Sequence, residues 1–501
     1  MTRIRMMLTG FCVFIAAACQ SSVQVSDVEA TLFNPEQTGI RWGLVVAEMD
    51  GTELIAIRAD DRFTPASNTK VITTMAAYHH LAKLEGYEHA PGTQVLLERT
   101  PPRIPPNLIL KGGGDAMLSD TPDCKMHCLA DLADQIADLG IDAFNLLIGD
   151  DTWLPYERWG VGWSVEDLQF YYGTAISALS VNDNLVWVEI LPGAGPGDLA
   201  NVRWRVGDEY LQLQNELYTA DAEAETDFGV ERYPGASNVR IYGRLAIDND
   251  PISFPLAIEN PAEFAALRLK RLLAARGVSV GGVETRHRGL SLADIPDDPS
   301  DAVETLPASL ETETAVASST PIVATLASSA LTESLRRISK DSENLHADLV
   351  LRRLGLLEGT GSRAFGVAQL EAFMTEAGIP ETGYALHGGS GMSIYNRISP
   401  RSMVQLLTFA ARQPWFDQWL ADQPIGGVDG SLERRFVGTS LEGKVFAKTG
   451  TLNGANALSG VLISERGKRL LFSIIANDRP ATTRSATPEM DAALVAIAET
   501  Y

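Results

Sequence analysis

Three short motifs contain the residues of this 501-residue chain that are best suited to chemistry. In chain order they are Ser67-Asn68-Thr69-Lys70, Ser342-Glu343-Asn344 and Lys448-Thr449-Gly450. A serine hydroxyl becomes an effective nucleophile when a base takes its proton, and a lysine can be that base only when its pKa falls. Each motif alone also fits a helix cap or a turn. The three together, each in a suitable local context, indicate an acyl-transfer site.

The first motif lies where the sequence predicts the start of a helix. Residues 64–67 read Thr-Pro-Ala-Ser, and proline is tolerated in the first turn of a helix. Serine and lysine three positions apart lie on one helical face, so Ser67 and Lys70 are neighbours. Free N–H groups of the first turn favour negative charge that develops near Ser67. We therefore expect Ser67 to be the nucleophile and Lys70 the base, with burial and the charge of Lys448 lowering the pKa of Lys70.

The third motif is predicted to lie on a strand that enters a hairpin. Two apolar runs rich in β-branched residues, 458–463 and 470–476, surround a charged turn that contains Gly467. Lys448 and Thr449 on such a strand offer a positive charge and a hydroxyl to a substrate carboxylate. Gly450 has no side chain, so substrate backbone can approach the strand there.

The second motif is ambiguous, because Ser-x-Asn occurs at Ser180-Val181-Asn182 as well as at Ser342-Glu343-Asn344. Ser180 lies in a stretch that is typical of a strand entering a turn. Ser342 lies instead between two helical segments, 331–338 and 345–354, where short polar side chains favour a loop. A loop between helices can present both side chains to a cleft. We therefore assign Ser342 to proton relay toward a leaving amine and Asn344 to holding a substrate amide.

The three motifs resemble the catalytic fragments of penicillin-recognising serine enzymes. The chain as a whole resembles the D-alanyl-D-alanine carboxypeptidase/endopeptidases of the penicillin-binding protein 4 type, which are class C low-molecular-mass penicillin-binding proteins. Compact serine β-lactamases have the same motifs but place the first two much closer together. Further stretches that resemble this family are residues 110–115, 147–151, 176–184, 390–393, 427–432 and 448–454. One departure is His387-Gly388-Gly389-Ser390-Gly391, where the family usually has Asp-Gly-Ser-Gly.

The resemblance implies a fold and a domain organisation. We expect an α/β (α+β) transpeptidase/β-lactamase-like domain whose antiparallel sheet is flanked by helices and interrupted by a large, mainly β insert. The expected boundaries are 1–18 for a signal peptide, 19–87 plus 311–501 for the catalytic domain, and 88–310 for two inserted domains, one nested in the other. The sequence itself predicts a hairpin over 40–57, an amphipathic helix over 260–276 and a last helix that begins at Thr487-Pro488. The segment 290–321 is longer and more acidic than the family pattern suggests.

The resemblance also assigns further residues and a reaction. The backbone N–H of Thr451, with that of Ser67, is implied to form the oxyanion hole, and Asp150 is implied to face the cleft and contact the cationic end of a peptide stem. For Asp150, a turn aspartate after a strand is an equally good interpretation. The implied reaction is cleavage of D-Ala-D-Ala in peptidoglycan stem peptides and cross-links through an acyl-enzyme on Ser67, with β-lactams acylating the same serine. No metal or organic cofactor is implied.

Two other classes of function fit the same motifs. A β-lactamase or an esterase would differ in the rate at which its acyl-enzyme is hydrolysed. A catalytically silent, cell-wall-binding lipoprotein would keep the fold without the chemistry, although the complete set of motif residues argues against it. The formal net charge of −23 argues against partners such as nucleic acid or anionic lipid surfaces. The length predicts at least two domains. The sequence does not determine an oligomeric state.

The first residues have the features of an export signal. Arg3 and Arg5 precede an apolar stretch over 6–18 that is too short for a stable membrane span. Small residues at 16–18 then precede Cys19, which resembles a bacterial lipoprotein processing site with Cys19 as the lipid-bearing residue. Plain secretion is the alternative. Both interpretations place the chain in the periplasm, with contact to a membrane only through the possible lipid anchor.

The four cysteines have different expected fates. Cys12 leaves with the signal and Cys19 is the lipidation candidate. Cys124 and Cys128 are four positions apart, and an exported chain permits a disulfide between them. The neighbouring His127 raises the alternative of a zinc site, but the two cysteines and this histidine are only three ligands, whereas structural zinc sites have four.

Overall fold

The computed structural model describes residues 28–33, 39–86, 91–206, 210–296, 320–480 and 485–501. The predicted signal peptide, Cys19, the predicted boundary at 310/311 and most of the acidic segment lie outside the described residues. Within the described ranges, no helix is both long enough and apolar enough to cross a membrane.

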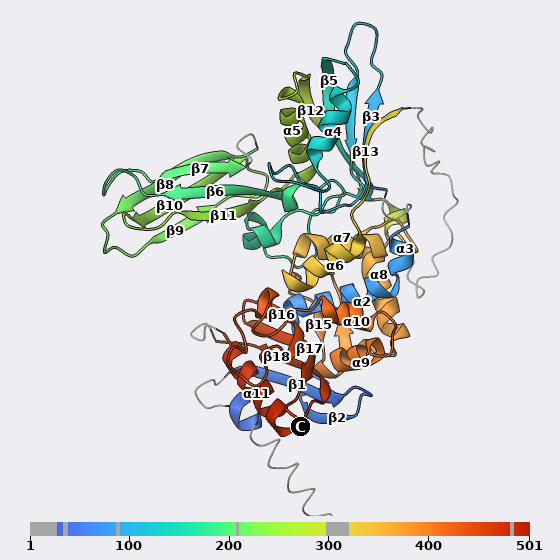
Figure 1. The fold of residues 1–501 in the computed structure, drawn as a ribbon, viewed down its shortest axis with the longest axis vertical. Coiled ribbons are helices and arrows are strands. Elements are labelled where there is room, and N and C mark those ends of the chain that lie inside the picture. Colours follow the sequence, from blue (N-terminus) through green and yellow to red (C-terminus); the bar gives the residue numbers. More distant parts are fainter. Residues whose placement is uncertain (1–27, 34–38, 87–90, 207–209, 297–319, 481–484) are drawn as a thin grey trace, which may run out of the picture.

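The catalytic domain is built on a five-stranded antiparallel sheet that both ends of the chain complete (Figure 1). The strand order is β16-β17-β18-β1-β2, so β16 is an edge strand. The predicted hairpins are confirmed, because β1 pairs with β2 and β17 pairs with β18. The strands of this sheet are β1 (Arg41–Glu48), β2 (Glu53–Ile57), β16 (Val445–Leu452), β17 (Ala455–Ile463) and β18 (Arg469–Asn477).

Alternate residues of the sheet point into two different hydrophobic cores. Val461 and Ile475 join the core on the face that carries most of the helices, whereas Leu458 and Ile474 join the core beneath α11 (Thr487–Thr500). Because both faces of the sheet are covered, β17 and β18 are buried along almost their whole length and are mostly apolar. The helices of the first face are α2 (Thr69–His79), α6 (Leu331–Lys340), α7 (Asn344–Leu354), α8 (Arg363–Glu376), α9 (Pro400–Ala410) and α10 (Phe416–Ala421).

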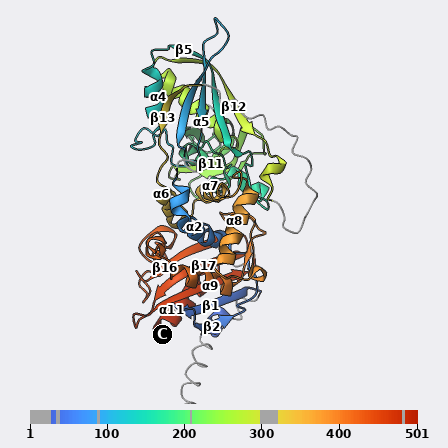
Figure 2. The same cartoon turned by 90° about the vertical axis from the view of Figure 1, so that its right-hand side faces the viewer.

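The insert begins with a second five-stranded sheet, of order β12-β5-β4-β3-β13, which lies beyond α6 and α7 from the catalytic sheet (Figure 2). Two helices pack on it around an apolar core that includes Leu132 and Leu269. The predicted amphipathic helix is α5, and the side chain of Asn260 caps its first turn. The elements are β3 (Thr93–Glu98), β4 (Asn107–Lys111), α4 (Leu129–Ala137), β5 (Ala143–Pro155), α5 (Pro261–Ala274), β12 (Ser279–Arg288) and β13 (Ile322–Leu326).

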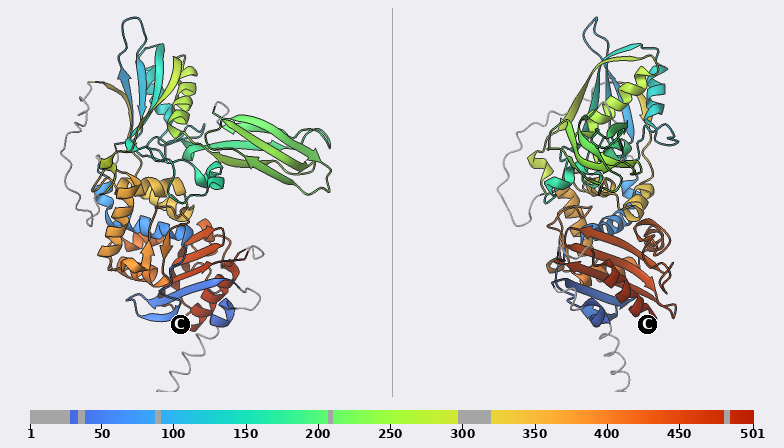
Figure 3. Two further views of the ribbon diagram at one scale, coloured as in Figure 1. Left: turned by 180° about the vertical axis from the view of Figure 1, so that it is seen from behind. Right: turned by 90° about the vertical axis from the view of Figure 1, so that its left-hand side faces the viewer.

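Between β5 and α5 the chain forms a further β unit that projects to one side of the molecule (Figures 1 and 3). Two three-stranded sheets, β11-β6-β7 and β8-β10-β9, share one apolar core, to which Phe264 of α5 contributes. We call this unit the β sandwich. Its strands are β6 (Leu185–Leu191), β7 (Asn201–Val206), β8 (Gln212–Ala220), β9 (Asp227–Glu231), β10 (Asn238–Ala246) and β11 (Ile252–Ala257).

One pairing changes the proposed domain boundaries. β13 pairs with β3, so residues 322–326 belong to the sheet of the insert and not to the catalytic domain. We therefore propose that the chain returns to the catalytic domain after residue 326 and not at 310/311. The short elements that remain are α3 (Leu81–Leu84), β14 (Tyr384–Ala385) and β15 (Arg397–Ile398). A disulfide joins Cys124 to Cys128 on the insert, as the sequence predicts for an exported chain.

Candidate active site

Ser67 and Lys70 lie together at the start of α2. Ser67 is in a 3-10 turn over Ala66–Asn68 that leads directly into the helix at Thr69, so the predicted helix start is confirmed within two residues. The Lys70 Nζ lies 3.0 Å from the Ser67 Oγ. It also donates to the Asn344 Oδ1 and to the Ser390 carbonyl oxygen, each at 2.5 Å. Three acceptors thus surround an amine that has no exposed surface.

Burial is what makes Lys70 a possible base. It lowers the pKa of Lys70 from 10.5 to about 7. The charges that act on this amine, those of Asp348 and Glu343, oppose burial and raise the pKa. For Lys70, burial is the cause that lowers the pKa. The repulsion between the two buried ammonium groups lowers the pKa of Lys448. That the charge of Lys448 also lowers the pKa of Lys70 stays a prediction.

Lys448 and Ser342 form the second pair of the site. Lys448 lies on the edge strand β16 and is buried, and its Nζ donates to the Ser342 Oγ at 2.9 Å. Burial lowers the pKa of Lys448 well below its usual range, and the charge of Lys70 lowers it further. Ser342 has a φ of +65°, a left-handed conformation that is unusual for serine. This conformation persists only where neighbouring residues impose it.

Asn344 connects Lys70 to the insert. It is the first residue of α7, and its Oδ1 accepts from Lys70. Its Nδ2 donates to the carbonyl oxygen of Tyr172 at 2.8 Å. The structure therefore brings together the serine-lysine pair and the Ser-x-Asn loop, as the sequence predicted. Ser180, the rejected alternative, is buried elsewhere, and its hydroxyl donates to the carbonyl oxygen of Ser177.

The edge strand β16 approaches the start of α2 closely at Gly450. A Cβ on Gly450 would lie 2.4 Å from the carbonyl oxygen of Pro65, so this position requires glycine. The contact is thus between two parts of the protein, whereas the sequence suggested room for substrate. Asn68 reinforces the contact by donating from its Nδ2 to the carbonyl oxygen of Lys448 at 2.7 Å. Next along β16, the Thr449 hydroxyl donates to the Ser431 Oγ at 2.7 Å.

A cleft of about 460 Å³ lies over these groups. It is lined by residues of the catalytic domain and the insert: Ser67, Asp167, Tyr171, Tyr172, Asp341, Ser342, Asn344, Gly391, Met392, Thr449, Thr451, Leu452, Asn453 and Arg479. Asp150 is not among them. It is buried in β5, where its Oδ1 accepts from the backbone and the hydroxyl of Thr152. The aspartate that the insert does bring to the cleft is Asp167, whose pKa burial raises.

The loop that contains the departure from the family pattern closes the back of the site. Ser390 supplies the carbonyl oxygen that Lys70 contacts, and Gly389 donates its N–H to the Oδ1 of Asp348 at 3.1 Å. A Cβ on Gly388 would lie 3.6 Å from that same oxygen. Neither Ser390 nor Asp348 was predicted from the sequence to have a role. The Ser-Gly pair at 390–391 was the available signal for the loop, whereas nothing marked Asp348.

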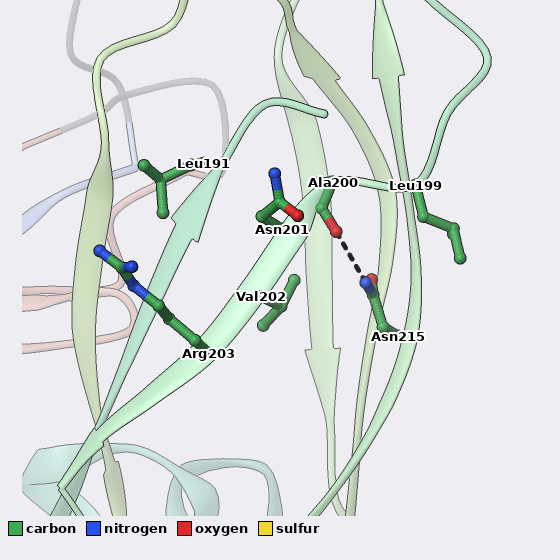
Figure 4. Close-up of a pocket in the computed structure, with 7 residues that line it drawn as sticks. All are labelled: Leu191, Leu199, Ala200, Asn201, Val202, Arg203 and Asn215. Carbon is green, nitrogen blue, oxygen red and sulfur yellow. Dashed lines mark hydrogen bonds between the residues drawn. The ribbon is translucent and has the colours of Figure 1, made fainter. Parts of the chain in front are cut away.

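Other features of the structure do not compete with this cleft. A pocket of about 520 Å³ in the β sandwich is lined by Leu191, Leu199, Ala200, Asn201, Val202, Arg203 and Asn215 (Figure 4). The residues that line it include no serine, threonine, cysteine or lysine, and its Arg203 is paired with Glu189. His127 lies beside Asp115, and His346 is buried between Ser334 and Asp183. Among the described residues, no group of histidine, cysteine and carboxylate side chains is arranged to hold a metal ion.

Taken together, the antiparallel sheet, the helix that begins at Ser67 and the buried lysines define a serine acyl-transfer enzyme with a transpeptidase-like fold. The D-Ala-D-Ala carboxypeptidase 3 (S13) family matches residues 24–289 and 302–501. The chain is 30% identical over 489 residues to the D-alanyl-D-alanine carboxypeptidase of Actinomadura sp. (strain R39), covering 94% of this chain and 84% of that protein. The chain therefore belongs to the S13 family of D-Ala-D-Ala carboxypeptidases.

Two further comparisons agree. The chain is 23% identical over 461 residues to the D-alanyl-D-alanine carboxypeptidase DacB of Haemophilus influenzae, covering 90% of this chain and 88% of that protein. The crystal structure of penicillin binding protein 4 (dacB) from Haemophilus influenzae matches with a TM-score of 0.75 at 21% identity, over 95% of this chain and 97% of that one. This likeness confirms the predicted fold class.

Proposed function

We propose that this chain hydrolyses the D-Ala-D-Ala bond of peptidoglycan stem peptides through an ester on Ser67. The observation that carries the proposal is the contact of 3.0 Å between the Lys70 Nζ and the Ser67 Oγ, in a cleft that also contains Ser342 and Thr449. An amine that is half neutral at neutral pH and contacts the Ser67 hydroxyl is the arrangement that activates a serine.

Each step of the proposed reaction is assigned to a named residue. Lys70 takes the proton of Ser67, whose Oγ attacks the carbonyl carbon of the penultimate D-alanine. The N–H groups of Ser67 and Thr451 stabilise the oxyanion of the tetrahedral intermediate. When the peptide C–N bond breaks, Ser342 passes its proton to the leaving amine and takes one from protonated Lys70, which becomes neutral again. Water then attacks the ester while Lys70 takes a proton from that water. Lys70 returns this proton to the Ser67 Oγ when the ester C–O bond breaks, which releases the shortened peptide.

The cleft supplies the groups that a D-alanyl peptide requires. Lys448 and Thr449 offer an amine and a hydroxyl to the terminal carboxylate, whose negative charge favours the protonated form of Lys448. Asn344 offers its amide to the peptide backbone. Asp167, from the insert, is the carboxylate available for a cationic group on the stem, the role that the sequence analysis gave to Asp150. β-Lactams are proposed to acylate Ser67 in place of the peptide; the Haemophilus influenzae structure has also been solved as a complex with a β-lactam.

The deciding experiment is labelling with a fluorescent penicillin. We expect wild-type protein to be labelled stoichiometrically and Ser67→Ala not at all. Ser237→Ala, an exposed serine of the β sandwich, is the matched control and should be labelled like wild type. Equal labelling of Ser67→Ala and wild type would refute the proposal.

Two assays separate the neighbouring functions. Release of D-alanine from a pentapeptide measures carboxypeptidase activity, and loss of cross-linked dimers from purified sacculi measures endopeptidase activity. A β-lactamase would turn over a chromogenic β-lactam many times per Ser67. A silent wall-binding protein would bind sacculi without labelling or product.

The proposed place of action is outside the cytoplasm, in the periplasm, where the peptidoglycan is found. The relatives whose sequences match are named as D-alanyl-D-alanine carboxypeptidases, and such activity requires access to the cell wall. Whether Cys19 carries a lipid can be tested by metabolic labelling with a fatty acid. We expect label on wild type and none on Cys19→Ala; no label on either would favour plain secretion.

A further inference from the structure

A single carboxylate of the insert contacts both helices that flank the Ser-x-Asn loop. The carboxylate of Asp183 accepts from both terminal nitrogens of Arg337, at 3.0 and 2.9 Å. It also lies 3.1 Å from the Nε2 of His346. Arg337 is on α6, immediately before the loop, and His346 is in the first turn of α7, immediately after it. Ser342, Glu343 and Asn344 therefore lie between two points that are both held by Asp183.

The turn that presents Asp183 is itself held in an unusual conformation. Asn182, Asp183 and Asn184 have φ values of +52°, +54° and +57°, so three successive residues other than glycine are left-handed. The side chain of Asn182 accepts from the Ser119 hydroxyl and the Asp120 N–H. The side chain of Asn184 accepts from the backbone of Val181. Strain of this kind persists where surrounding bonds impose it, and it is concentrated at functional positions.

The contact continues from Arg337 into the loop. The guanidinium of Arg337 lies 3.7 Å from the Oε1 of Glu343. The backbone N–H of Glu343 also donates to the carbonyl oxygen of Arg337 at 3.5 Å. Glu343 separates Ser342, which is left-handed, from Asn344, which touches Lys70. On the other side, the Nδ1 of His346 lies 3.2 Å from the hydroxyl of Ser334, and the His346 side chain has no exposed surface. This histidine therefore joins α7 both to α6 and to the insert.

Charge favours this arrangement. Burial alone would raise the pKa of Asp183, but the hydrogen bonds and charges of His346 and Arg337 outweigh it and lower the pKa to about 2. Asp183 is thus ionised wherever the enzyme works. A bidentate bond between arginine and a carboxylate also fixes direction, which a single contact does not.

We propose that Asp183 is a positioning residue, which holds Arg337 and His346 so that Ser342 and Asn344 stay beside the two lysines. This inference rests on the proposed function. Asp183 does not touch the reacting atoms, so its removal should slow acylation at saturating β-lactam more than it weakens binding of the β-lactam. The insert thereby takes part in the geometry of the catalytic loop through one side chain.

The test is a double-mutant cycle with Asp183→Asn and Arg337→Gln. Asparagine tolerates the left-handed region, so the turn is retained while the charge is removed. We expect each variant to lower the limiting rate of acylation by a fluorescent penicillin about tenfold. The double variant should lower it about tenfold as well, because both substitutions remove the same contact between Asp183 and Arg337. Asp221→Asn, an exposed aspartate of the β sandwich, should acylate like wild type.

Several outcomes would overturn the inference. An Asp183→Asn rate within about twofold of wild type, or a loss of about a hundredfold in the double variant, would show that the two residues do not act together. A lower melting temperature with an unchanged rate would show a purely structural role. If Asp183→Asn does not fold, His346→Gln, which removes the other contact, is judged by the same thresholds. Wild-type protein that is not labelled at all would refute the proposed function instead.

Discussion

The pH dependence of acylation is the most direct consequence of the buried serine-lysine pair. Lys70 must be neutral to take the proton of Ser67, and burial lowers its pKa from 10.5 to about 7. At pH 7 about half of the enzyme then has a neutral Lys70, roughly a thousandfold more than an exposed lysine would provide. Below this midpoint, the neutral fraction falls about tenfold for each pH unit. Acylation should therefore rise with pH up to about 7 and level off above it.

The measurement is the second-order rate constant for acylation by a fluorescent penicillin between pH 5 and pH 9. We expect the value at pH 5 to be about a hundredfold below the plateau. Melting temperatures in the same buffers would show that the protein stays folded across the range, and a stable fluorogenic dye would control for changes of signal with pH. A rate that keeps rising tenfold per unit to pH 9, as for an exposed lysine, would refute the reasoning. A rate that is independent of pH from 5 to 8 would do so as well.

Three other substitutions test separate parts of the structure. Asp348→Asn removes a carboxylate that raises the pKa of Lys70, so the midpoint of the same pH profile should move to lower pH, by about one unit; a shift to higher pH would contradict this. Gly450→Ala places a methyl group against backbone at the start of α2, and we expect both the melting temperature and the acylation rate to fall; an unchanged value of either would show that the strand can move aside. Cys128→Ser opens a loop that Cys124 closes over few residues, so unfolding in denaturant should become easier by about 2 kcal/mol or less, with acylation unchanged.

The sequence was sufficient for features that depend on local spacing. Ser67 and Lys70 are three positions apart in a segment with helical signals, and one helical turn brings them together whatever the rest of the fold does. Ser342 could be chosen over Ser180 because the segments on either side of it are predicted to be helices, and they form α6 and α7. The apolar runs with β-branched residues on both sides of Gly467 predicted two strands, which are β17 and β18 of the catalytic sheet.

The placement of the insert could not be predicted in the same way. Asp150 and Asp167 both belong to the insert, and both are acidic residues in plausible local contexts. Only the packing of β5 buries Asp150 against Thr152, and only the turn before Tyr172 brings Asp167 to the cleft. Which side chain faces a cleft between domains depends on the orientation of whole domains, and no periodicity in the sequence records that orientation.

By itself, the sequence determined the family of this protein, its fold class and the pairing of Ser67 with Lys70, since these follow from motif order and from the period of a helix. The tertiary structure alone decided the electrostatics of the site. Lys70 has a low pKa because helices far apart in the chain exclude water from it, and two carboxylates oppose that effect. The tertiary structure likewise brought Asp183 between α6 and α7. Burial and long-range contacts are properties of the packed chain, and therefore no short stretch of sequence contains them.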